Sequence, residues 1–142
     1  MENRPIMITH GRVMLFALVL SATLSADQSK PRPSIAVRAN PAVAFAPARV
    51  VATAELTGGT DDFQDYYCAK VEWNWGDSTT SEAQDDCDPY EAGKSQIRRR
   101  YTNEHKFELP GQYEVRFSLR QGKKTVGSGA ITVRIRDTET KR

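Results

Sequence analysis

Apolar and polar residues alternate along several short segments of this chain, and this period of two limits the possible fold more than any other feature. In the clearest segment, one face of a strand carries four apolar side chains, namely Tyr113, Val115, Phe117 and Leu119. A period of two is the repeat of a half-buried β-strand. No segment of the polar part of the chain shows a helical period, so we expect an all-β protein.

The same pattern, interrupted by turn residues, predicts about seven short strands. They are expected near residues 35–39 (an edge strand), 50–56, 67–75, 79–83, 97–107, 113–119 and 125–136. We expect the fifth strand to bend or break near Asn103 and the last to contain a bulge within Gly127 to Gly129. Short strands at this spacing predict an immunoglobulin-like antiparallel β-sandwich in preference to a barrel.

The N-terminus has the layout of a secretory signal peptide. Basic residues precede an apolar stretch at residues 13–20, and the small residues Ser25 and Ala26 suit cleavage. About 12 apolar residues are too few for a helix that needs about 20 to cross the hydrocarbon. We therefore predict a signal peptide (1–26), a polar linker (27–34), one domain (35–136) and a polar tail (137–142), in a secreted or periplasmic protein. An uncleaved signal anchor is the alternative.

Charge and cysteine content exclude several classes of site. With 20 Lys and Arg against 18 Asp and Glu, the net charge of +2 does not suit a protein devoted to nucleic acid or to an anionic membrane.

Cys68 and Cys87 are the only cysteines, and in an oxidising compartment such a pair usually forms a disulfide. The chain has no C-x-x-C motif and no histidine cluster, so we expect no metal and no other cofactor. Strand parity places Cys68 opposite Trp73, which predicts a disulfide on the outside of the sandwich.

Two motifs resemble the signatures of PKD domains. The letters W-N-W-G-D-S at residues 73–78 are similar to W-D-F-G-D-G, and residues 105–115 are similar to H-x-Y-x-x-P-G-x-Y-x-V. The residues at the motif positions are Trp73, Trp75, Gly76, Asp77, His105, Phe107, Pro110, Gly111, Tyr113 and Val115. The chain departs from the pattern at Asn74, Trp75 and Ser78, where the family prefers Asp, Phe and Gly. The resemblance implies a seven-stranded immunoglobulin-like sandwich that binds proteins or carbohydrate outside the cytoplasm and catalyses no reaction.

The motif residues themselves are interpreted as structural. Trp73 and Trp75 are expected between the sheets and not on a ligand platform. His105 lies in phase with apolar neighbours, which favours a hydrogen-bonded histidine over a general base. Tyr113 follows a Pro-Gly turn and could bond nearby backbone as a tyrosine corner does. Asp77 is expected to cap its turn and not to bind calcium.

The candidate binding surface joins an acidic loop at residues 84–95 to a basic strand. Its expected members are Asp85, Asp86, Asp88, Glu91, Lys94, Arg98, Arg100 and Lys106. The four basic residues are expected to share one side of a strand, which Arg116 and Arg120 could extend. The alternative is a solvated face whose charges pair across strands.

The preferred function is a non-catalytic binding module for an extracytoplasmic protein or polysaccharide. The alternative is a structural or accessory domain that spaces or docks a partner protein, and an enzyme is the least favoured class because no nucleophile, base and orienting group converge. The sequence leaves the ligand and the oligomeric state open.

Overall fold

The computed structural model describes residues 29–138. The expected signal peptide and the last residues of the expected tail lie outside the described residues. Within the described part, no helix has the length and apolar character that a membrane crossing requires.

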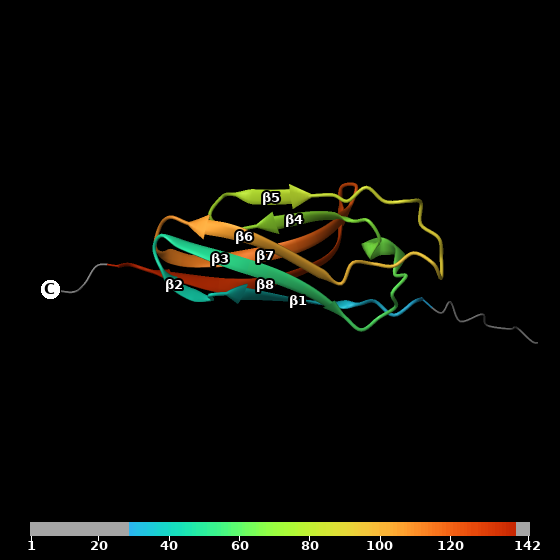
Figure 1. Ribbon diagram of the computed structural model, residues 1–142, viewed down its shortest axis with the longest axis horizontal. Helices are drawn as coiled ribbons and strands as arrows, with labels where there is room; N and C mark the ends of the chain where they lie inside the picture. The colour runs from blue at the N-terminus through green and yellow to red at the C-terminus, as the bar shows by residue number, and fades with distance from the viewer. Residues whose placement is uncertain (1–28, 139–142) are drawn as a thin grey trace, which may run out of the picture.

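Two β-sheets pack face to face (Figure 1). The first has three strands in the order β1-β3-β6, with bounds Ser34–Asn40, Ala48–Thr57 and Arg100–Phe107. The second has five strands in the order β2-β8-β7-β4-β5, with bounds Val43–Phe45, Lys124–Arg136, Gly111–Gln121, Lys70–Asn74 and Thr80–Ala83. The only helical element among the described residues is the short 3-10 helix η1 (Gln64–Tyr66). The predicted all-β, immunoglobulin-like sandwich is confirmed.

One strand pair differs from the antiparallel prediction. Strand β2 was not expected from the sequence, and it runs parallel to the C-terminal end of β8, with Val43 opposite Arg134 and Phe45 opposite Arg136. The remaining strand pairs are antiparallel. Edge strand β1 agrees with the predicted segment 35–39.

The core is built from the alternating apolar faces. In β7, Val115, Phe117 and Leu119 are fully buried, and in β3 five inward side chains are buried, namely Ala48, Val50, Ala52, Ala54 and Leu56. Burial of each valine, leucine or phenylalanine side chain contributes about 1.5–3 kcal/mol. The alternation read from the sequence therefore identifies the faces that hold the sheets together.

Three strand details differ from expectation. Strand β4 begins at Lys70 and not at residue 67, because η1 and the following turn, where Cys68 has a φ of +49°, occupy the preceding residues. Strand β6 begins at Arg100 and runs without a break through Asn103. The bulge lies at buried Val126, just before the predicted positions, since Leu119 pairs with Gly127 and Arg120 with Thr125.

The chain packs on the domain before β1 begins, so residues 29–33 do not form a free linker. Pro33 is fully buried, and the carbonyl of Pro31 accepts a hydrogen bond from the Thr60 N–H at 3.1 Å. The Arg32 guanidinium lies over the ring of Phe63, 5.6 Å from its centroid. Ordered packing therefore starts earlier than the alternation pattern indicates.

Candidate binding surface

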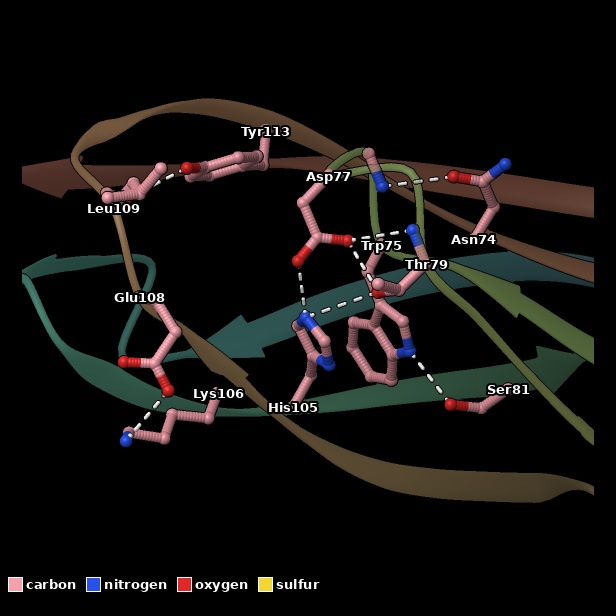
Figure 2. A network of polar contacts seen from close by, with 11 residues as sticks. Asn74, Trp75, Asp77, Thr79, Ser81, His105, Lys106, Glu108, Leu109 and Tyr113 are labelled. Carbon is pink, nitrogen blue, oxygen red and sulfur yellow. Dashed lines mark hydrogen bonds and ion pairs between the residues drawn. The ribbon is translucent and has the colours of Figure 1, made fainter.

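The first motif forms a tight turn between β4 and β5 that only glycine can complete (Figure 2). The Gly76 N–H donates to Asn74 Oδ1 at 2.9 Å, and the Thr79 N–H donates to Asp77 Oδ1 at 3.1 Å. Gly76 has a φ of +79°, and a Cβ there would lie 2.7 Å from the carbonyl oxygen of Glu114. The turn therefore needs both the left-handed backbone and the close approach to β7 that a glycine permits.

An aspartate-histidine pair joins this turn to β6. His105 Nε2 lies 2.6 Å from Asp77 Oδ2, and an ionised carboxylate only accepts, so Nε2 carries the proton. The imidazole stacks on Trp75, with ring centroids 4.6 Å apart and an interplanar angle of 11°. Burial acts to raise the pKa of Asp77, but hydrogen bonds from Thr79 and His105 outweigh it and hold that pKa below its usual value.

The geometry of this pair is that of a structural contact. The Thr79 hydroxyl lies 3.5 Å from the same ring nitrogen that bonds Asp77, and it also bonds Asp77 Oδ1. In a catalytic triad the acid and the nucleophile contact opposite nitrogens of the imidazole. His105 therefore orients the turn and is not placed to activate Thr79.

The second motif supplies the neighbouring corner (Figure 2). The Tyr113 hydroxyl donates to the Leu109 carbonyl at 2.8 Å, which is the tyrosine-corner contact expected from the sequence. Its ring stacks on Phe107 at 4.6 Å. Pro110 lies in the connection from β6 to β7, Gly111 begins β7, and Val115 enters the core. Trp73 and Trp75 stack on each other inside the sandwich.

The connection between β5 and β6, residues 84–99, is the longest segment without strand or helix in the part of the chain that the structure describes, and we call it the stapled loop. A disulfide joins its Cys87 to Cys68, with Cα atoms 6.1 Å apart. Cys87 is exposed and Cys68 is half-buried, so the disulfide lies outside the core as predicted. The parity argument behind that prediction is wrong, because Cys68 precedes β4 and does not belong to the strand.

Asp62 holds the middle of the stapled loop. Its Oδ2 accepts hydrogen bonds from the Gly93 N–H at 2.8 Å and from the Lys30 ammonium, while its carbonyl accepts from the Tyr90 hydroxyl at 2.7 Å. The Lys30 contact, followed by the Gly93 contact, holds the pKa of Asp62 below its usual value, and the same contact with Asp62 raises the pKa of Lys30.

Ile97 and Arg99 anchor the far end of the stapled loop. Ile97 is buried, and its N–H donates to the Asp61 carbonyl at 2.7 Å. The Arg99 guanidinium donates to the Gly58 carbonyl and to Asp61 Oδ1, each at 2.6 Å. The loop is thus held at its start by the disulfide, in the middle by Asp62 and at its end by these residues.

Two hollows flank the aromatic pair Tyr67 and Tyr90, whose ring centroids are 5.7 Å apart. One hollow of about 310 Å³ is lined by Lys30, Phe63, Gln64, Asp65, Tyr90 and Ala92. The other, of about 320 Å³, is lined by Tyr67, Asp88, Pro89, Glu91, Lys94, Ser95 and Gln96. Aromatic rings beside carboxylate, amide and hydroxyl groups form a surface suited to polar ligands.

The predicted basic strand face is wrong. Lys94 and Arg98 belong to the stapled loop, and only Arg100 and Lys106 lie on the outer side of β6. Arg116 and Arg120 belong to β7 in the other sheet. The cause is the late start of β6, which removes half of the expected residues from the strand.

The four basic residues instead make ion pairs, but only the Arg100–Glu55 pair crosses between strands, as the alternative interpretation expected. Their nitrogen-to-oxygen distances are 2.6 Å for Lys94–Glu91, 3.6 Å for Arg98–Asp85, 3.5 Å for Arg100–Glu55 and 2.8 Å for Lys106–Glu108. Arg98 also donates to the carbonyl of Arg100 and lies 4.9 Å from the Tyr101 ring centroid. Of the eight candidates, Asp86 and Asp88 alone make no ion pair within the described residues.

Sequence reasoning missed Lys30, Asp62, Tyr67 and Tyr90 as parts of this surface. Asp62 lies between the predicted strands at 50–56 and 67–75, and Tyr67 is the first residue of the second of these. Their contacts join residues about 20 to 60 positions apart, as from Lys30 to Tyr90. Local sequence patterns carry no signal for contacts of this kind.

Comparison with known proteins gives a likeness to solved structures and none to a family model or a curated protein. Among solved structures it is similar to the PKD domain of an M14-like peptidase from Thermoplasmatales archaeon SCGC AB-540-F20, with 15% sequence identity and a TM-score of 0.49. The match covers 75% of this chain and 98% of that chain. PKD domains are also the family that the two sequence motifs resemble.

Proposed function

We propose that this chain is a non-catalytic, extracytoplasmic binding module whose ligand-binding surface is the stapled-loop end of the sandwich. The observation that supports this proposal is the fixed conformation of a long connection. Connections of more than about 12–15 residues without secondary structure are uncommon in compact domains and are usually functional when ordered. Here a disulfide, the Asp62 contacts and the buried Ile97 hold residues 84–99 in place.

A preformed surface favours binding because less conformational freedom is lost when the ligand is bound. The hollows beside Tyr67 and Tyr90 have volumes at the lower end of the range of small-ligand sites. Exposed carboxylates at Asp86 and Asp88, on either side of Cys87, add polar groups without internal ion-pair partners among the described residues. A polysaccharide or a polar segment of another protein fits this chemistry.

One observation supports the alternative function, a structural or accessory domain: the basic residues of the predicted surface are paired within the domain. Because Lys94, Arg98, Arg100 and Lys106 are all ion-paired within the domain, these side chains serve the fold and do not provide a free cationic face. The proposed surface therefore excludes Arg100 and Lys106 and is restricted to the stapled loop and its neighbours.

Charge reversal in the loop tests the proposal. The D86K/D88K variant changes two exposed carboxylates that hold no ion pair among the described residues. The control is E108K, which reverses an exposed carboxylate on another loop that pairs with Lys106. On a glycan array and in capture from an extracytoplasmic fraction, we expect the wild type and E108K to retain the same ligand and D86K/D88K to lose it. Equal retention by all three proteins, or retention of no ligand by the wild type, would contradict the proposal.

A further inference from the structure

Strand β2 leaves peptide groups available at the edge of the five-stranded sheet. Two hydrogen bonds of 2.9 Å bracket its contact with β8, from the Arg134 N–H to the Ala42 carbonyl and from the Ala46 N–H to the Arg136 carbonyl. Residues along a strand point their N–H and C=O groups alternately to either side. Ala44 therefore pairs with β8, while the peptide groups of Val43 and Phe45 point to the open edge.

The outer face at this edge is apolar and cationic. Val43 is 48% exposed and Phe45 is 58% exposed, which makes them two of the four large exposed hydrophobic residues in the described part of the chain. Val43 lies opposite Arg134 and Phe45 opposite Arg136 in the parallel register, so all four side chains share the outer face.

The two arginines differ from the other arginines on the same sheet face. Arg116 is paired with Glu114, and Arg120 with Glu72 at 2.9 Å. Arg134 and Arg136 take part in none of the ion pairs among residues 29–138. Arg38, on β1 in the other sheet, is a strand arginine of the same kind and serves as a matched control.

We propose that β2 is a docking strand for an extended acidic peptide of another protein. The peptide adds to the open edge of β2 through its backbone and places Asp or Glu side chains against Arg134 and Arg136, while its apolar residues cover Val43 and Phe45. A symmetric contact with a second copy of this chain would bring the same two arginines together, so charge complementarity favours a different, acidic partner. This surface lies at the end of the sandwich opposite the stapled loop and does not depend on the function proposed for that loop (Figure 1).

Selection from a random dodecapeptide library tests the proposal on the exported protein. The library is selected in parallel on the wild type, on R134E/R136E and on the control R38E. We expect peptides enriched on the wild type to alternate acidic with apolar residues and to bind R38E with the same affinity. Reversal of two exposed charges is expected to weaken their binding by about tenfold or more, with a melting temperature within a few degrees of the wild type.

Amide chemical shifts locate the contact. With a selected peptide, the largest ¹⁵N–¹H shift changes are expected at Val43, Phe45 and the facing residues of β8. No enrichment, enrichment of neutral or basic peptides, equal binding by R134E/R136E, or shift changes at another surface would overturn the proposal. Binding of phosphatidylglycerol vesicles that is lost in R134E/R136E, without peptide enrichment, would assign the patch to a lipid surface and would also overturn it.

Discussion

At the scale of single residues, Asp77 contributes most to the polar contacts at the motif end of the sandwich. Its carboxylate accepts hydrogen bonds from the Thr79 backbone, the Thr79 hydroxyl and His105 Nε2. The side chains of Asp77 and His105 are 21% and 18% exposed, so these contacts are shielded from most solvent. A charged acceptor in such a site strengthens each bond that it accepts.

The D77N variant tests this role through its pH dependence. Because the folded-state pKa of Asp77 lies below its unfolded value of about 3.9, the stabilisation from the ionised group is complete above the unfolded value. It disappears as the pH falls through the folded pKa. We expect D77N to be about 1–3 kcal/mol less stable than the wild type at pH 7 and this difference to shrink near pH 3. Urea unfolding at both pH values measures it, and an equal difference at both would exclude a role for the ionised carboxylate.

At this scale the sequence predicted correctly which side chains point into the core, but it did not predict which charged residues pair with each other. The alternation placed Trp73, Trp75 and Val115 in the core because strand parity is a local property. It misplaced Arg98, whose partners Asp85 and Tyr101 depend on where β6 begins. Pairing of charges is decided by tertiary neighbours, which a single sequence does not show.

At the scale of elements, the stapled loop is the individual feature of this sandwich. The disulfide joins residues 19 positions apart and ties the loop to the turn before β4. Neither cysteine belongs to the core, so the sheets do not depend on the bond for their packing.

Replacement of both cysteines by serine is therefore expected to leave the sandwich folded. The chain-entropy cost is at most about 3 kcal/mol for a loop of this length. We expect a cooperative thermal transition at a lower temperature and faster amide exchange confined to the residues near Cys87 in C68S/C87S. A double variant that is unfolded at room temperature would show that the disulfide supports the core.

Element boundaries were predictable where the alternation is long, and not where short segments interrupt it. Strands β3 and β7 each carry at least four residues in phase, and each contains its predicted segment and extends beyond it by one or two residues at either end. Strand β2 has three residues between Pro41 and Pro47, too few to establish a period. The start of β4 was misplaced because Tyr67 and Ala69 continue its alternation although η1 and a turn precede the strand.

At the scale of the whole molecule, the residues that hold the sandwich together and the proposed binding surface lie in different parts of the domain. The middle holds the aromatic core, and the motif residues fix one end through Asp77, His105 and Tyr113. The opposite end carries the stapled loop and η1, beside the start of the described chain (Figure 1). The fold class followed from the sequence, whereas the surface at the stapled-loop end arises from contacts among segments near residues 30, 62, 67 and 84–99.

The central claim is that this end is a preformed binding surface in the free protein, and backbone ¹⁵N relaxation tests it most directly. We predict order parameters of about 0.85 for the amides of residues 86–96, equal to those of β3 and β7, because the disulfide and Asp62 restrain the loop. Values below about 0.6 through this segment, with rigid strands on either side, would show a flexible loop. That result would contradict a preformed surface.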